Sequence, residues 1–210
     1  MPGISIDRSK GVGEEQGTGH NRWHPAIEPV IEVRPGEAVE LETRDALDGQ
    51  LTSASTEADF GSLNVGRAHA LTGPVRVAGA EPGDLLEVEF VSIEPEPWAY
   101  TSITPGSGYL GDLGFEPLLV HWEIERGDEG GWARSAQLPN FRLPGAPFMG
   151  VSGVAPSLEE VAAGAVVRRS GRRAGAPSSF PARTAPCPAR GRQRGTGCGR
   201  SRRVRTAATW

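Results

Sequence analysis

One pattern occurs twice in this chain and limits the folds that it can adopt: a short apolar strand, a Pro-Gly turn beside an acid, and a strand that alternates acidic and apolar residues. The first copy spans residues 30–44 and turns at 34–37, and the second spans residues 75–93 and turns at 81–84. A period of two is typical of a half-buried strand, and Pro-Gly favours a tight turn. Each copy is therefore predicted to be a β-hairpin.

The composition also indicates a mainly β protein. The 210 residues include 29 glycines and 18 prolines, and only 6% are aromatic, which favours a turn-rich chain over a helical bundle. Further strand patterning at residues 118–124 completes the prediction of a β-sandwich or barrel-like fold with hairpins. One short helix is expected near residues 157–166, because Ser157 and Glu160 have the spacing of a capping box.

The distribution of apolar residues and cysteines bears on the compartment. No run approaches the roughly 18 apolar residues that a membrane span requires, so no membrane partner is expected. The N-terminus has no basic and apolar segments typical of a secretory signal. Both cysteines, Cys187 and Cys198, lie near the C-terminus. The expected location is the cytoplasm.

Charge divides the chain into two regions. Residues 161–210 carry twelve arginines and no Lys, Asp or Glu, whereas residues 1–160 carry 10 basic and 26 acidic residues, a net charge of −16. We therefore expect an N-terminal β domain over 1–160 and an Arg-rich tail over 161–210. The tail can be interpreted as a basic nucleic-acid or membrane-binding arm, as a disordered segment, or as a GC-rich gene translated in a shifted frame. The acidic body opposes nucleic-acid binding, so no nucleic-acid partner is expected.

The candidate site begins at Thr18–Pro25, which holds His20, Asn21, Trp23 and His24. Imidazole is a common metal ligand and titrates near neutral pH, so His20 and His24 are candidates for metal binding or acid–base catalysis. Pro25 and the absence of an adjacent glutamate argue against a helical zinc motif. In the structural alternative, the histidines hydrogen-bond the backbone while Trp23 packs in the core.

Two further stretches supply candidate groups. Asp45 and Asp48 follow a predicted strand, and they either stabilise their own turn or act as paired carboxylates in catalysis or metal binding. His69 is a third metal ligand or a polar residue at the start of a strand. Thr72 and Gly73 set the turn that follows. His121, inside an apolar strand, is expected to be a core or interface histidine with satisfied hydrogen bonds.

Several of these segments resemble the acetamidase/formamidase family, in the same order along the chain. They are Gly19–Pro25, the loop from Asp45 to Gln50, His69–Val75 with its continuation Gly79–Leu86, and Pro147–Pro156. The chain departs from the family pattern at Ala70, where a proline is expected, and at Arg76, where an aromatic residue is more usual. The resemblance covers about residues 18–160.

The resemblance implies a mostly β, cytoplasmic hydrolase that converts short linear amides to a carboxylate and ammonia. His20, His24, Asp45 and Asp48 are then the catalytic candidates, and Asn21, Trp23, Thr72 and Gly73 the substrate-binding candidates. A divalent metal, zinc or calcium, is expected on His20, His24 and His69, with no organic cofactor. Family members tend to form homo-oligomers. The main alternative is a non-catalytic β-rich module that binds a small ligand, in which the histidines are structural.

The family resemblance also bears on the tail. Family members continue after residue 160 with roughly as much chain again, including a segment like Pro-Pro-Arg-Glu-Asn-Gly-Gly-Asn. Codons compatible with Ser201–Trp210, read from each third base, permit those eight residues. We therefore expect a shift of reading frame shortly after Glu160. A chain of this kind is expected to have little or no amidase activity.

Overall fold

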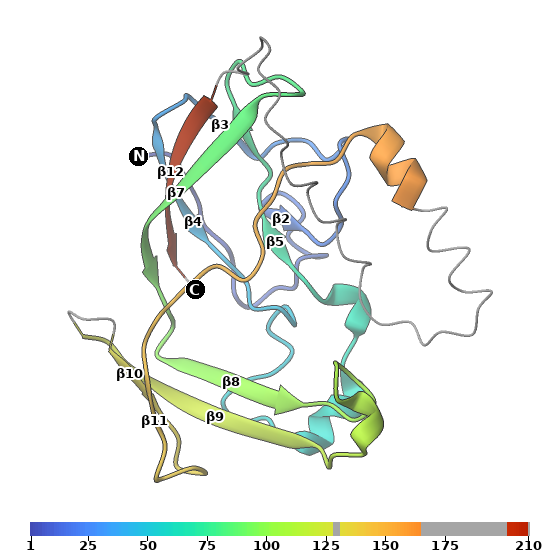
Figure 1. The fold of residues 1–210 in the computed structure, drawn as a ribbon, viewed down its shortest axis with the longest axis vertical. Coiled ribbons are helices and arrows are strands. Elements are labelled where there is room, and N and C mark those ends of the chain that lie inside the picture. Colours follow the sequence, from blue (N-terminus) through green and yellow to red (C-terminus); the bar gives the residue numbers. More distant parts are fainter. Residues whose placement is uncertain (128–130, 165–200, 210) are drawn as a thin grey trace, which may run out of the picture.

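The computed structural model describes residues 1–127 and 131–164, and the backbone of residues 201–209 (Figure 1). In the described residues the fold is mainly β, as predicted, with four sheets and one short α-helix over residues 158–164. Within this part of the chain, no helix is long and apolar enough to cross a membrane. In chain order the labelled elements are β1 (Gly3–Ile4), β2 (Gly19–His20), β3 (Ile31–Val33), β4 (Ala38–Glu42), η1 (Glu57–Ser62), η2 (Val65–Arg67), β5 (Leu71–Thr72), β6 (Val75–Val77), β7 (Leu85–Glu94), β8 (Trp98–Ile103), η3 (Gly111–Leu113), β9 (Leu118–Glu125), β10 (Trp132–Arg134), β11 (Arg142–Pro144) and β12 (Ser201–Thr209).

Both Pro-Gly turns form where the sequence predicts them. The backbone N–H of Glu37 donates to the carbonyl of Arg34 at 3.0 Å, and that of Asp84 donates to Glu81 at 3.0 Å. In each turn the acid also accepts a hydrogen bond from the first residue: Glu37 from the Arg34 N–H at 2.8 Å, and Asp84 from the Glu81 N–H at 3.1 Å. The recurring acid therefore closes the turn.

The strands on either side of these turns do not form the two predicted hairpins. β3 pairs in parallel with β6, whereas β4 and β7 each pair in parallel with β12. Each repeated unit therefore crosses from one sheet to another, and the two strands face each other through side chains. The prediction of hairpins was wrong because alternation identifies a strand with one buried face, and says nothing about which backbone it pairs with.

The core lies between these sheets. Val33 of β3 and Val39 of β4 are each 1% exposed, and partly buried residues of β3, β4, β6 and β7 pack against them: Ile31, Leu41, Val75, Val77 and Leu86. Burial of apolar side chains is the main favourable contribution to folding. Packing of one sheet on another around such a cluster gives the sandwich-like architecture expected from the sequence.

Strand β12 was not expected. Residues 201–209 belong to the region predicted to be disordered, yet they form a parallel strand between β4 and β7 (Figure 1). In this register Arg203 lies opposite Glu87 and Arg205 opposite Glu89. The remainder of the tail, 165–200 and 210, lies outside the described residues.

The predicted helix is confirmed over residues 158–164, and its expected last turn lies outside the described residues. Its capping box is complete. The Glu160 N–H donates to the Ser157 hydroxyl at 3.2 Å, and the Ser157 N–H donates to the Glu160 carboxylate at 2.7 Å. The helix crosses the domain boundary expected at residue 160.

The other four-stranded sheet is an antiparallel meander in the order β11-β10-β9-β8. It confirms the strand predicted at 118–124 and supplies genuine hairpins. His121 of β9 has both ring nitrogens satisfied, as predicted: Nδ1 accepts from the Trp98 indole at 3.2 Å, and Nε2 lies 2.9 Å from the Ser55 carbonyl. The contacts of His121 are therefore those of a structural residue.

Truncation of the core should destabilise the fold. Val33→Ala removes buried methyl groups and leaves a cavity, so we expect a loss of about 2 kcal/mol in the free energy of unfolding, measured by urea denaturation. Val65→Ala is the matched control, because Val65 is 80% exposed. That control should change stability by no more than about 0.5 kcal/mol. Equal effects of the two substitutions would contradict the assignment of the core.

Candidate functional site

A cavity of about 510 Å³ opens beside the core between the sheets. Its apolar lining includes side chains of β4 and β7, among them Val39, Leu41, Leu86, Val88 and Phe90. Its wall comes from four stretches that are far apart in the sequence: residues in the ranges 20–29, 43–46, 69–77 and 149–155. Pockets that combine an apolar lining with a few polar groups are typical of small-molecule sites.

Backbone pairing places His20 on this wall. β2 and β5 form a short antiparallel pair, in which Gly19 lies opposite Thr72 and His20 opposite Leu71. A Cβ atom at position 19 would lie 2.5 Å from the Leu71 carbonyl oxygen, so only glycine permits so close a pairing. The pair joins the first and third family-like segments into one unit.

The environment of His20 favours a neutral imidazole. Burial lowers the pKa of His20 below its ordinary value, and a backbone hydrogen bond with Arg22 opposes this effect in part. Its Nδ1 atom is buried and has no hydrogen-bond partner among the residues that the structure describes. The Trp23 ring lies edge-on to the imidazole, with centroids 6.3 Å apart. The His20 ring therefore has one buried nitrogen whose hydrogen-bonding capacity is not used by the described residues.

The other two candidate histidines line the same cavity. His24 accepts the Ala26 N–H on Nδ1 at 3.1 Å, which places the proton of a neutral ring on Nε2. His69 adopts a positive φ of 60° and donates its backbone N–H to the Ala46 carbonyl at 2.7 Å. This bond ties the Asp45–Gln50 loop to the His69 segment. The three histidines thus surround one space.

The expected metal site is a separate question. In residues 1–127, 131–164 and 201–209, no group of three or more His, Cys, Asp or Glu side chains is arranged to hold a metal ion. The described residues alone therefore do not fit the zinc or calcium site expected on His20, His24 and His69.

The two candidate carboxylates lie outside the cavity lining. Asp45 accepts the Leu47 N–H at 2.8 Å and the Tyr100 hydroxyl at 2.9 Å. Burial raises the pKa of Tyr100, and the charge of Asp45 raises it further. These contacts agree with the turn-stabilising alternative for Asp45.

Asp48 is almost fully buried, at 2% exposed. Its carboxylate accepts the Val12 N–H at 3.0 Å and the Arg67 Nε–H at 2.9 Å, and it lies 3.8 Å from Arg44 Nε. The contacts with Val12 and Arg67 connect backbone segments that are distant in the sequence, whereas Arg44 lies four residues before Asp48. The geometry of Asp48 is that of a structural carboxylate.

The four candidate substrate-binding residues divide in the same way. Trp23 and Thr72 line the cavity, whereas Asn21 and Gly73 do not. Asn21 donates its side-chain amide to the Gly66 carbonyl, and Gly73 donates its N–H to Thr18 at 3.1 Å. Trp23 is 41% exposed and is not a core residue. A methyl group at Gly153 would come within 3.1 Å of its ring, so the 149–155 segment lies against the indole.

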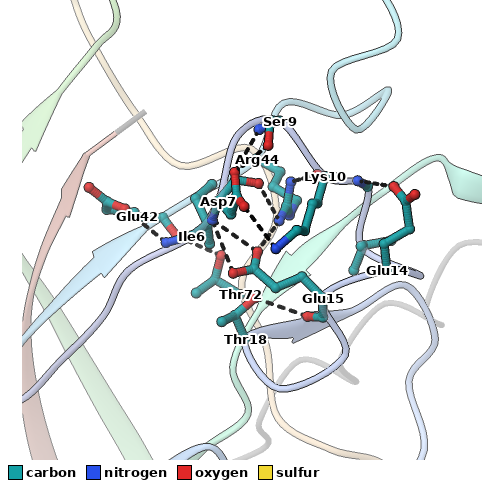
Figure 2. A network of polar contacts seen from close by, with 12 residues as sticks. Ile6, Asp7, Ser9, Lys10, Glu14, Glu15, Thr18, Glu42, Arg44 and Thr72 are labelled. Carbon is teal, nitrogen blue, oxygen red and sulfur yellow. Dashed lines mark hydrogen bonds and ion pairs between the residues drawn. The ribbon is translucent and has the colours of Figure 1, made fainter.

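Arg44 is a central residue that the sequence did not single out. Its side chain is 6% exposed, lies on the cavity wall, and forms an ion pair with Glu15 while donating to the carbonyls of Asp7 and Lys10 (Figure 2). Glu15 in turn accepts the Asp7 N–H on both carboxylate oxygens at 3.0 Å. This network attaches the N-terminal loop to the end of β4. An arginine at a strand exit was the only sequence signal, because Glu15, Asp7 and Lys10 lie 29 or more residues away.

Comparison with known proteins places these segments in a known group. A family model described as "Acetamidase/Formamidase family" matches residues 5–173. The acetamidase of Mycolicibacterium smegmatis is 33% identical over 172 residues, covering 75% of this chain and 41% of the relative. The formamidase of Methylophilus methylotrophus is 30% identical over 162 residues, covering 74% of this chain and 39% of the relative. The chain thus spans about two fifths of the length of these curated relatives.

This chain also resembles solved structures of similar proteins. The gamma lactamase from Delftia acidovorans superposes with a TM-score of 0.73 at 28% identity, covering 86% of this chain and 45% of the other. The acetamidase from Bacillus halodurans superposes with a TM-score of 0.58 at 29% identity, covering 66% of this chain and 44% of the other.

The structural assignment of Asp48 predicts a loss of stability on neutralisation. Asp48→Asn should lower the free energy of unfolding by about 3 kcal/mol, because Arg44 and Arg67 would lose a buried counter-charge. Glu32→Gln serves as the control, since Glu32 faces Arg76 at 3.9 Å and both side chains are largely exposed. The control should lose less than about 1 kcal/mol in the same urea titration. A stability of Asp48→Asn equal to that of the parent would refute a structural role.

The lowered pKa of His20 predicts a pH dependence of stability. Because the unfolded chain binds the proton more readily, stability contributed by neutral His20 is present above the ordinary value of 6.5 and decreases as the pH falls below it. Urea unfolding of the parent and of His20→Gln should therefore differ in slope between about pH 7 and about pH 5, with the shallower decline in the variant. Parallel profiles would show that His20 titrates normally in the folded protein.

Proposed function

Because the chain belongs to the acetamidase/formamidase family, we propose that its cavity is part of the site of an amide hydrolase that acts on short linear amides. One observation supports this more than any other: residues of all four family-like segments line a single cavity. The first and last of these segments are more than 120 residues apart in the sequence, so their convergence needs a common reason. A shared substrate site provides one.

Amide hydrolysis requires an activated water, stabilisation of the tetrahedral oxyanion, and a proton for the leaving amine. Residues 1–186 contain no cysteine, so no thiol nucleophile is available from that part of the chain. His20, neutral and with an unpartnered Nδ1, is suited to accept a proton from the attacking water. His24, with the proton of its neutral ring on Nε2, is suited to donate to the carbonyl oxygen or to the leaving amine.

The proposed mechanism gives no role to the candidate carboxylates or to the expected metal. Asp45 and Asp48 receive no catalytic step, because hydrogen bonds already engage both carboxylates. No step is assigned to a divalent metal, because the described residues do not form a site for one. Homo-oligomerisation and a cytoplasmic location stay predictions. The choice among formamide, acetamide and larger amides is left to direct assay.

The chain by itself should hydrolyse amides weakly or not at all. It spans 41% of the Mycolicibacterium smegmatis acetamidase, so a complete site would need groups from the rest of such a protein. The measurement is ammonia release from formamide and acetamide by the purified 210-residue chain. Turnover comparable to that of the intact relative would contradict this expectation.

The roles of the histidines can be tested in a chimera, in which residues 18–160 replace the matching part of that acetamidase. We expect His20→Gln to reduce kcat by roughly a hundredfold or more, the size of a lost acid–base contribution. His121→Gln is the control, because His121 is hydrogen-bonded outside the cavity. Equal activity of His20→Gln and the parent chimera would remove His20 from the mechanism.

A second candidate function is small-ligand binding without catalysis. The engagement of Asp45 and Asp48 in structural hydrogen bonds favours it, since it leaves the cavity with imidazoles and apolar groups. Calorimetric binding of acetamide to the chimera, with no ammonia released, would support this alternative over hydrolysis.

A further inference from the structure

His69 lines the cavity in a backbone conformation that histidine rarely adopts. Its φ of 60° lies in the left-handed region, which is disfavoured for a residue with a Cβ atom. Residues other than glycine keep such a conformation only when the surrounding structure fixes it, and they cluster at functional sites. The His69 N–H donates to the Ala46 carbonyl at 2.7 Å. The place of the imidazole on the cavity wall therefore depends on the loop that holds Ala46.

This loop is shaped by the Asp45 carboxylate. Its Oδ1 atom accepts the Leu47 N–H at 2.8 Å, and its Oδ2 atom accepts the Gly49 N–H at 2.5 Å. A short polar side chain that binds backbone N–H groups a few residues ahead is a common way to fix a turn. The two bonds close the backbone around Ala46, whose carbonyl holds the histidine.

The same loop also holds the residues that precede His69. Gln50 donates its side-chain amide to the Asn64 carbonyl at 3.2 Å and accepts the Asn64 N–H at 2.7 Å. Arg67 donates to the Asp48 carbonyl at 3.1 Å. The loop therefore fixes the whole stretch of backbone from Asn64 to His69.

Tyr100 reaches the Asp45 carboxylate from another sheet. It lies on β8, in the meander drawn in the lower part of Figure 1, and its hydroxyl donates to Asp45 Oδ1 at 2.9 Å. Burial and the Asp45 charge raise the pKa of Tyr100, so the hydroxyl keeps its proton and stays a donor. Hydrogen bonds to a charged group are stronger than those between neutral groups. A chain of contacts thus runs from Tyr100 through Asp45 and Ala46 to His69.

We propose that Tyr100 and Asp45 are positioning residues of the candidate site, which act through the Ala46 carbonyl to fix the His69 imidazole on the cavity wall. Neither side chain belongs to the described lining of the cavity, so both act at a distance from a bound substrate. The proposal gives His69 a place in the amide chemistry beside the other two histidines, and in this respect it rests on the proposed function. The chain of hydrogen bonds can be tested without turnover.

The first test is hydrogen exchange of single backbone amides, measured by NMR in the complete 210-residue chain. Tyr100→Phe removes only the hydroxyl, and we expect the His69 amide to exchange about tenfold faster, the effect of losing one hydrogen bond to a charged group. The Gly73 amide, which donates to Thr18 at 3.1 Å, should keep its rate. A general loss of stability would accelerate both amides equally. Equal acceleration, or an unchanged rate at His69, would overturn the proposal.

Two further variants accompany this measurement. Asp45→Asn keeps the size of the side chain but replaces one acceptor oxygen by a donor, so it should also accelerate exchange at His69. Tyr109→Phe is the control, because it removes a hydroxyl from a side chain that is 91% exposed and outside the described lining of the cavity. The control should leave the His69 amide unchanged, and acceleration as large as that in Tyr100→Phe would overturn the assignment.

The second test determines whether Tyr100 acts through His69. In the chimera with the Mycolicibacterium smegmatis acetamidase, Tyr100→Phe should reduce kcat by about tenfold, because a displaced site group loses its alignment. In the chimera that already carries His69→Gln, the same substitution should change kcat by less than about twofold, because the group on which it acts is absent. Effects that multiply would overturn the proposal. An inactive parent chimera would contradict the proposed function, and the exchange rates would then decide the positioning of His69.

Discussion

The packing of Val33 against Val39 is the contact on which the other features of this protein depend. It brings strands on either side of a Pro-Gly turn face to face, so the chain crosses between sheets and does not pair with itself. The second repeated unit does the same, which sets β6 beside β3 and leaves β4 and β7 on either side of β12. The cavity lies next to this core, and Val39 belongs to both.

Charged groups then determine which residues remain available for chemistry. Arg44 and Arg67 engage Asp48, and Tyr100 engages Asp45, so the carboxylates stabilise loops around the cavity. Charges that are buried must be paired, and these pairs hold the N-terminal loop and the Asp45–Gln50 loop to β4 and η2. The histidines, held by backbone pairing and one backbone hydrogen bond each, are left on the wall. The acids therefore have structural contacts, whereas the histidines line the cavity.

The candidate site and the apolar face of β7 border the same cavity. Residues that would contact a substrate, such as Trp23 and Thr72, share the cavity with Val88 and Phe90 of β7.

The sequence by itself determined the local features of this protein. Alternation located β7 and β9, Pro-Gly with an acid located both turns, and Ser157 with Glu160 located the helix start; each depends on residues only a few positions apart. The tertiary structure alone decided that the repeated units cross between sheets, that Asp48 is a buried counter-charge, that Arg44 anchors the N-terminal loop, and that residues 201–209 form a strand. The physical reason is distance along the chain. Strand partners and buried ion pairs are chosen by contacts between residues many positions apart, and neither alternation nor composition records which distant surfaces will meet.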